Sequence, residues 1–195
     1  MPLSPPKPRS KKHIRKVLLE GFQREDGLFD IEGTLTDEKT FDFPNASKQR
    51  PAGTFVHEMR VRITVDAQFI VREAEVASDT RPWDGACETV VPDYRSLVGL
   101  NLARGFRKAV AERFGKAKGC THINELLGAI PTATFQTFSG SLRALNDPEQ
   151  IGAILDTCHA MSRSSEPVRK YYPAWYVKPD AGPGVEGSRN SGSAD

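Results

Sequence analysis

The feature that most constrains the fold is a strict alternation of residue types at residues 55–65. One parity is apolar apart from one histidine: Phe55, His57, Met59, Val61, Ile63 and Val65. The other parity is polar: Glu58, Arg60, Arg62 and Thr64. A period of two is typical of a β-strand with one face on the core and one face in solvent. The chain is therefore expected to build an antiparallel sheet with one buried face.

Three further segments fit the same sheet. Apolar and polar residues alternate at 29–35, and Asp26-Gly27 just before them is a hairpin signal that joins this strand to an earlier one at about 15–24. The run Asp66–Gln68 predicts a turn into a fourth strand at 69–76. The segment 40–53 contains two prolines and is expected to be a connecting loop.

The second half of the chain is typical of helices. Helical spacing of apolar residues predicts one helix at about 106–114. Thr121 is a suitable N-cap for a second helix, which Pro131 is expected to kink or divide. Asp147 followed by Pro148 predicts the start of a last helix with its apolar stripe at Ile151, Ile154, Leu155 and Cys158. Strands followed by helices predict an α+β fold, with the meander of the N-terminal half packed against the helices of the C-terminal half.

Composition places a single folded domain at residues 13–178. Residues 1–12 are rich in proline and lysine, and residues 179–195 are rich in glycine and serine, so both segments are expected to be disordered tails. Six of the 27 basic residues lie within the first 16 positions, and the remainder holds 21 basic and 25 acidic residues. Because the positive charge gathers in a tail, no nucleic-acid-binding face is expected.

The expected compartment is the cytoplasm. No stretch approaches the roughly eighteen apolar residues that a membrane helix needs, and no apolar segment follows the basic N-terminus as it would in a secretory signal. Three cysteines in no framework spacing are typical of free thiols in a reducing compartment.

Several stretches resemble one bacterial family, the proteins grouped as domain of unknown function 2889. The matching runs are REDGLFDIEGTLTDEK (24–39), HEMRVRITVD (57–66), LVGLNLARGF (97–106), GCTHINELLG (119–128) and TFQT (134–137). The resemblance covers about residues 15–176. It brings no agreed reaction. It implies only a loose association with bacterial breakdown of aromatic compounds, which could include cofactor-independent lyases acting on lignin-derived molecules.

Two histidines are the first candidates for chemistry. His57 shares the apolar parity of its strand, so it is either a hydrogen-bonded core residue or part of the lining of a pocket. His122 lies next to Cys120 and Thr121 at a predicted helix start, where amide donors favour anions and can depress a thiol pKa. Cys120 could be a nucleophile, His122 a general acid or base held by Glu125, or the turn could bind a substrate carboxylate. Capping and packing are the plain alternative.

Charged residues on the polar parity of two neighbouring strands form a second candidate. If the strands pair, Asp30 and Glu32 face Arg60 and Arg62 across the sheet. Cross-strand salt bridges are the simpler interpretation. An arginine site for a substrate carboxylate is the functional one.

Two further features have weaker chemical meaning. The segment 171–176 is aromatic and includes Trp175, which could close over a ligand, contact another subunit or cover the core. Cys120, His122, Cys158 and His159 do not form a recognised ligand spacing, so no metal site is expected. No phosphate loop, dinucleotide fingerprint or nucleophile elbow is present in the sequence.

These residues favour acid–base chemistry, and together with the family resemblance they lead to the hypothesis of a cofactor-independent lyase or isomerase acting on a small aromatic or carboxylated substrate. His57 and His122 would exchange protons while an arginine orients the substrate. The alternative is a non-catalytic protein for small-ligand binding or assembly, which could include a homo-oligomer. The two hypotheses differ in geometry, because an enzyme would bring both histidines into one open cavity.

Overall fold

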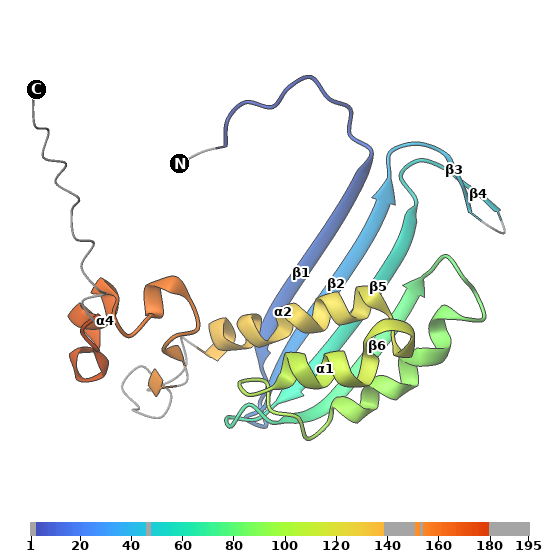
Figure 1. The fold of residues 1–195 in the computed structure, drawn as a ribbon. Helices are drawn as coiled ribbons and strands as arrows, with labels where there is room; N and C mark the ends of the chain where they lie inside the picture. The colour runs from blue at the N-terminus through green and yellow to red at the C-terminus, as the bar shows by residue number, and fades with distance from the viewer. Residues whose placement is uncertain (1–2, 46–47, 139–150, 153, 180–195) are drawn as a thin grey trace, which may run out of the picture. The chain divides into compact units, whose positions relative to one another are not determined.

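The computed structural model describes residues 3–45, 48–138, 151–152 and 154–179, and these fall into two compact units, Met1–Leu142 and Arg143–Asp195. The first unit contains a four-stranded antiparallel sheet in the order β1-β2-β5-β6 (Figure 1). Its strands are β1 (His13–Gln23), β2 (Phe29–Lys39), β5 (Phe55–Val65) and β6 (Val71–Thr80). A short hairpin of β3 (Phe43–Asn45) and β4 (Lys48–Arg50) projects from the segment predicted to be a loop.

Helices of the first unit cover one face of this sheet. They are η1 (Cys87–Leu97), α1 (Phe106–Phe114), η2 (Lys116–Lys118) and α2 (Thr121–Phe138). α2 runs across β1, β2 and β5, and α1 lies along α2 (Figure 1). The predicted α+β fold, with an antiparallel sheet in the first half and helices in the second, is confirmed.

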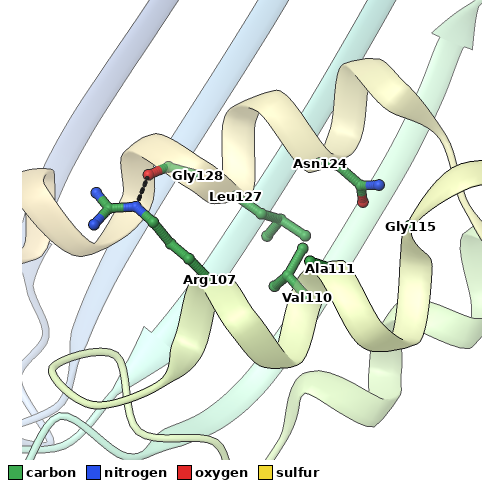
Figure 2. A pocket seen from close by; sticks show the side chains of 7 residues that line it. All are labelled: Arg107, Val110, Ala111, Gly115, Asn124, Leu127 and Gly128. Carbon is green, nitrogen blue, oxygen red and sulfur yellow. Dashed lines mark hydrogen bonds between the residues drawn. The ribbon is translucent and has the colours of Figure 1, made fainter.

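A cavity of about 280 Å³ lies between α1 and α2 and opens to solvent (Figure 2). The Arg107 Nε donates to the Gly128 carbonyl at 2.9 Å across it. Its wall is mostly apolar because Val110 and Leu127 face it. The cavity therefore lies between the two helices and away from the sheet.

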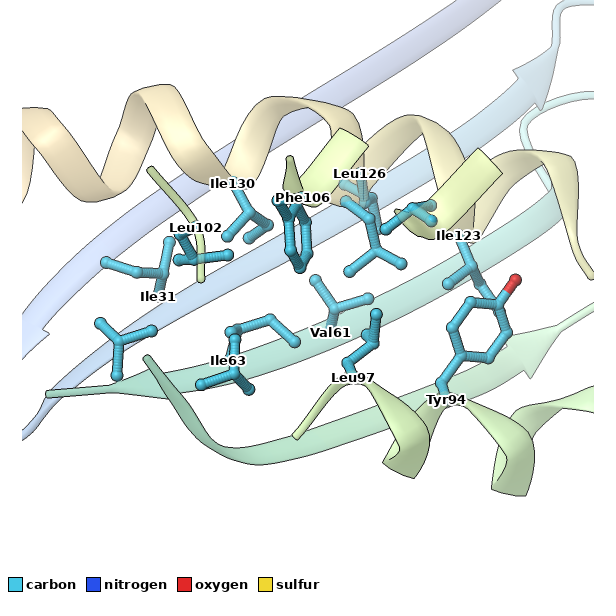
Figure 3. Packing of buried hydrophobic residues seen from close by; sticks show 14 of the residues in the cluster. Ile31, Val61, Ile63, Tyr94, Leu97, Leu102, Phe106, Ile123, Leu126 and Ile130 are labelled. Atoms are coloured by element: carbon cyan, nitrogen blue, oxygen red, sulfur yellow. The ribbon is translucent and has the colours of Figure 1, made fainter. Parts of the chain in front are cut away.

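The core forms between the inner parity of the strands and the inner faces of the helices (Figure 3). The register places Ile31 opposite Ile63 and Leu35 opposite Met59, and all four are buried. The alternation at 55–65 thus predicts the buried face correctly. β6 begins two residues later than the predicted strand. Phe69 closes the turn that starts at Asp66, and Ile70 forms an isolated bridge to Asn101.

One helix prediction differs from the structure, and one helix was not predicted. α2 continues through Pro131 to Phe138 without dividing, since a proline removes one hydrogen bond but the buried face of this helix continues on both sides of it. The predicted helix start at Asp147–Gln150 lies outside the described residues. η1 was not expected at all, because Pro92 and mixed polarity hide its helical character.

The second unit has its own small core. The single domain predicted over residues 13–178 stays a prediction. Ile151, Leu155 and Val168 are buried there, with Tyr172, Trp175 and Tyr176 packed around them. Its described elements are η4 (His159–Met161), α4 (Glu166–Tyr171) and η5 (Pro173–Trp175). The aromatic segment thus packs on this local core.

A close approach between β1 and α2 gives a test of the packing. A Cβ added to Gly21 would lie 1.8 Å from the Thr137 Oγ1, whereas a Cβ on Gly128 would meet nothing within 4 Å. We predict that Gly21→Ala lowers the free energy of unfolding by about 1–3 kcal/mol through overpacking. Gly128→Ala is the control, on the helix that Gly21 of β1 approaches, and it should be neutral or stabilising by up to about 1 kcal/mol.

Both variants can be compared with the wild type by urea unfolding. Equal stability of the Gly21→Ala variant and the wild type would show that β1 and α2 do not approach as closely as described.

Candidate functional site

A row of charged and titratable side chains crosses three strands at one end of the inner face. The register places Arg15 of β1 directly opposite Asp37 of β2, and Asp37 directly opposite His57 of β5. A β-bulge follows at once, because Glu38 pairs with Phe55 and leaves Val56 as an extra residue in β5. Bulges often end regular pairing beside functional sites. The row therefore marks the place where the apolar core gives way to polar chemistry.

Asp37 is the centre of this row and is only 3% exposed. Its Oδ1 accepts from the Arg15 Nε at 2.8 Å and contacts the His13 Nε2 at 2.7 Å. Its Oδ2 accepts from an Arg15 terminal nitrogen at 2.7 Å and contacts the His57 Nδ1 at 3.1 Å. Burial would raise the pKa of Asp37, but the hydrogen bonds from Arg15 and His13 outweigh it and hold the pKa well below its usual range. The carboxylate is therefore ionised at neutral pH.

The start of α2 brings a second histidine over the row. The Cys120 N–H donates to the Tyr94 hydroxyl at 2.9 Å, and that hydroxyl donates to the Asn124 Oδ1 at 2.9 Å. The Asn124 amide in turn donates to the Phe114 carbonyl at 2.7 Å. These bonds fix the first turn of α2 against η1 and α1, and they hold His122 on the side that faces the sheet.

His57 and His122 lie against each other as a stacked pair. Their ring centroids are 3.7 Å apart and their planes differ by 29°. The His122 Nε2 lies 3.5 Å from the same Asp37 oxygen that contacts His57. The side chains of His57 and His122 are 17% and 21% exposed, so part of each ring is open to solvent.

Burial makes both imidazoles poor proton acceptors in the resting protein. It lowers the pKa of His57 to about 4, and the nearby His122 adds to the effect against the opposing pull of Asp37. Burial and then the Arg15 charge lower the pKa of His122 as well. When His57 is neutral, its Nδ1–H must donate a hydrogen bond to the ionised Asp37, because a carboxylate can only accept hydrogen bonds. The His57 Nε2 is thereby left with a free lone pair.

Among the described residues, one group of three side chains has donor atoms close enough together to bind a metal ion. Asp37, His57 and His122 each offer one donor atom, and these atoms all lie within 4.8 Å of one another. Two histidines and a carboxylate suit several transition metals. However, Arg15 already donates to both Asp37 oxygens. A cation at Oδ2 would therefore meet the positive charge of the guanidinium, and the arrangement favours proton chemistry over metal binding.

Sequence-predicted residues at the start of α2 occupy the edge of this cluster. The Cys120 Sγ lies 3.9 Å from the His122 Nδ1. Thr121 is the exposed first residue of the helix, and the Cys120 carbonyl already accepts from the Asn124 N–H, so the helix begins one residue earlier than a Thr121 cap requires. The Glu125 carboxylate bonds to Arg15 at 2.5 Å, so the carboxylate facing His122 is that of Asp37.

The structure does not bring the predicted arginines to the histidines. Arg60 and Arg62 lie on the outer parity of β5, on the opposite face of the sheet from His57. Arg62 bonds to Glu32 at 2.8 Å, and Arg60 bonds to Glu58 at 2.8 Å. The Arg62–Glu32 pair is a cross-strand salt bridge of the kind that the simpler interpretation expects. Glu58 belongs to the same strand as Arg60, and the cross-strand partner of Arg60 is Asp79 of β6, at 3.1 Å.

Asp30 lies on the other face of the sheet from the cluster. Asp30 accepts from the Thr64 hydroxyl at 2.7 Å on the outer face. Trp175 belongs to the second unit, where the Arg163 guanidinium lies 5.5 Å from the centre of its ring. Cys158 and His159 belong to that unit too.

Sequence reasoning missed Asp37, Arg15 and His13. A signal for Asp37 was present, because it shares the parity of Ile31 and Leu35 and is therefore a charged residue on the buried face of a strand. Arg15 and His13 carried a weaker signal, since they share the parity of the partly buried Leu19. Their convergence depends on the β1–β2 register, which alternation alone does not fix.

Fold and site together define an α+β protein with a one-sided antiparallel sheet and a histidine–aspartate cluster at the sheet's end. The chain belongs to the family described as protein of unknown function (DUF2889), whose model matches residues 13–136. That match contains the whole cluster, from His13 to Glu125. No match was found among curated proteins or among solved structures. Among the described residues, no helix is long and apolar enough to cross a membrane.

Asp37 should be the most stabilising member of the cluster. We predict that Asp37→Asn lowers the free energy of unfolding by about 3 kcal/mol, because it leaves Arg15 beside a neutral group in a buried position. Glu125→Gln is the matched control: the Glu125 side chain is 44% exposed, and its ion pair with Arg15 should contribute less than about 1 kcal/mol. Chemical unfolding of both variants measures the difference, and equal losses would contradict a central role for Asp37.

The lowered pKa of His57 predicts a pH dependence of stability. The unfolded chain binds a proton near the ordinary value of 6.5, whereas folded His57 binds it only near 4. Stability should therefore be complete above about pH 6.5 and fall by up to roughly 3 kcal/mol as the pH drops to 4. His122 acts in the same direction. Protonation of Asp37 destabilises the fold only at lower pH, because the ordinary pKa of its carboxyl is 3.8 and folding lowers that pKa.

Thermal unfolding between pH 4 and 7 measures this loss. The His57→Gln variant should show a flatter profile than the wild type. A profile as steep as that of the wild type would assign the loss to other groups.

Proposed function

We propose that the protein is a cofactor-independent acid–base enzyme, a lyase or isomerase that acts on a small aromatic or carboxylated substrate. The observation that supports this most is the stacked His57–His122 pair on the buried, ionised Asp37. A carboxylate that holds one imidazole nitrogen and leaves the other free is the usual way to orient a general base.

In this proposal His57 is the base. Its Nδ1–H bond to Asp37 fixes the tautomer, so Nε2 can accept a proton from a substrate carbon or hydroxyl. The imidazolium that forms would be stabilised by Asp37, whose charge lies 3.1 Å away. The proton that His57 has taken up would pass to His122, which is stacked on it, and His122 would return that proton to the substrate from the same side, which leaves both imidazoles neutral again. The low resting pKa of His57 keeps its imidazole unprotonated at neutral pH, so its Nε2 lone pair is free.

Arg15 supports a substrate that carries a carboxylate. Three of its five N–H donors are used, two on Asp37 and one on Glu125. Its side chain is 33% exposed, so the remaining donors can reach a ligand at the edge of the cluster. The aromatic part of the proposal, and a role in the breakdown of lignin-derived aromatics, rest on the family resemblance alone. A cytoplasmic location rests on the absence of a secretory signal pattern and on the spacing of the cysteines in the sequence.

The second candidate is a non-catalytic protein for small-ligand binding or assembly. It is favoured by one observation: the cavity between α1 and α2 is lined by none of the cluster residues. A ligand held there beside Arg107 would not touch either histidine.

The test uses a panel of aromatic carboxylic acids and their carbonyl and hydroxyl derivatives, incubated with the full chain in D₂O. NMR follows C–H exchange, isomerisation and cleavage together. We predict that His57→Gln and His122→Gln each slow the reaction about 100-fold while the melting temperature at pH 7 changes little. His159→Gln removes a histidine of the second unit and should keep the wild-type rate.

Two results would overturn the acid–base proposal. One is conversion that survives both substitutions. The other is binding of panel members without any exchange or turnover, which would instead support the ligand-binding candidate. Prior dialysis against a chelator should leave the rate unchanged, and loss of activity that returns with added metal would assign the cluster to a metal.

A further inference from the structure

The open edge of the sheet is β1, and its sequence is complementary to itself. Among the described strands β1 bonds only to β2. The opposite edge is partly covered, since Val71 at the start of β6 exchanges hydrogen bonds of 2.9 Å with Leu100 and Gly99. β1 is eleven residues long, contains no proline, and pairs with β2 in one unbroken register. Proteins usually protect such an edge with prolines, bulges or short length, because it is a template for another strand.

The apolar residues of β1 are unusually exposed. Val17 is 43% exposed, Leu18 is 55% exposed and Phe22 is 46% exposed. Leu18 and Phe22 share the outer face of the sheet, while Val17 lies on the inner face. The strand therefore presents apolar side chains on both faces, beside a row of backbone groups that bond to no second strand among the described residues.

The hydrogen-bonding parity shows which backbone groups are free. At the two ends of the β1–β2 pair, the Thr40 N–H donates to the Lys12 carbonyl and the Arg24 N–H donates to the Leu28 carbonyl. Even-numbered residues of β1 thus bond to β2, and odd-numbered residues direct their N–H and C=O groups outward. A second antiparallel strand must therefore pair odd residues with odd residues.

We propose that the protein forms a two-fold symmetric dimer in which β1 of one copy pairs antiparallel with β1 of the other, centred on Leu18. This register pairs odd residues with odd residues and uses the full strand. It sets Lys16 opposite Glu20 of the second copy, twice by symmetry. It also sets Ile14 opposite Phe22 and Leu18 opposite its own equivalent. The dimer joins the two sheets into one of eight strands.

Charge selects this register over its neighbours. A shift of two residues in one direction places Lys16 opposite Leu18, and a shift in the other direction places Lys16 opposite Phe22. Both shifts lose the Lys16–Glu20 ion pairs. Both also place a charged side chain opposite an apolar one, and such a cross-strand pair is less stable than an ion pair. Closed two-fold dimers are the commonest homo-oligomers, and their interfaces are self-complementary in this way. The proposal is independent of the proposed function.

A charge-exchange experiment tests the interface. Sedimentation velocity over a concentration series gives the dimer dissociation constant for the full chain. Lys16→Glu and Glu20→Lys should each raise that constant about tenfold or more, because each turns two attractive pairs into two repulsive ones. The double variant Lys16→Glu/Glu20→Lys restores opposite charges and should return to near the wild-type value. Circular dichroism shows that each variant is folded.

Cross-linking tests the register itself. Leu18→Cys places two thiols opposite each other at a non-hydrogen-bonded pair, where Cα atoms lie about 4.5 Å apart, so mild oxidation should give a covalent dimer. Glu20→Cys sets its thiol opposite Lys16 and should not cross-link above the wild-type background, which includes the exposed Cys158. A wild-type monomer at all concentrations would overturn the proposal. So would a dimer that ignores the charge exchange and cross-links equally from both positions.

Discussion

The interaction on which the cluster depends is the buried charge of Asp37. An ionised carboxylate that is 3% exposed is unstable unless several donors surround it. Asp37 obtains them from β1 through Arg15 and His13, and from β5 through His57, while His122 of α2 lies 3.5 Å from the same carboxylate. One carboxylate thus connects three strands and a helix. Removing its charge would take from His13, His57 and His122 the carboxylate that they share, and would leave Arg15 with Glu125 as its remaining acidic partner.

The position of the cluster follows from the one-sided sheet. Along the inner parity of each strand, the residues change from apolar to titratable at the same end: Leu35 is followed by Asp37 in β2, and Met59 is preceded by His57 in β5. The apolar part packs beneath α2, and the titratable part lies beneath the first turn of that helix. Because both parts share one face, the core that buries Asp37 also lowers the pKa values of His57 and His122. The burial that packs the core therefore also lowers the proton affinity of the two histidines.

The residue pattern predicts the individual strands and helices well. It predicts poorly which residues of different elements come into contact. The alternation at 55–65 predicts both the strand and the inward direction of His57, because a period of two is a property of the single strand. The partner of His57 is set by register, which joins residues 20 positions apart and depends on a bulge at Val56. Arg60 and Arg62 show the same limit: alternation places them correctly on the outer face, and that face is separated from the histidines by the sheet itself. α2 continues through Pro131 because its buried contacts outweigh one lost hydrogen bond.

β1 connects the chemistry of the site with the edge of the sheet. Its odd-numbered residues direct the side chains of His13 and Arg15 toward Asp37, while their backbone N–H and C=O groups point away from β2. An edge strand held on one side only is the part of a sheet that opens most readily. Two donors to the central carboxylate thus come from the least restrained strand of the sheet. Under the proposed pairing, the N–H and C=O groups of these two residues would bond to the second copy, while the even-numbered residues of β1 stay bonded to β2. The strand would then be held along both of its edges, and this would restrict the backbone that positions Arg15 and His13.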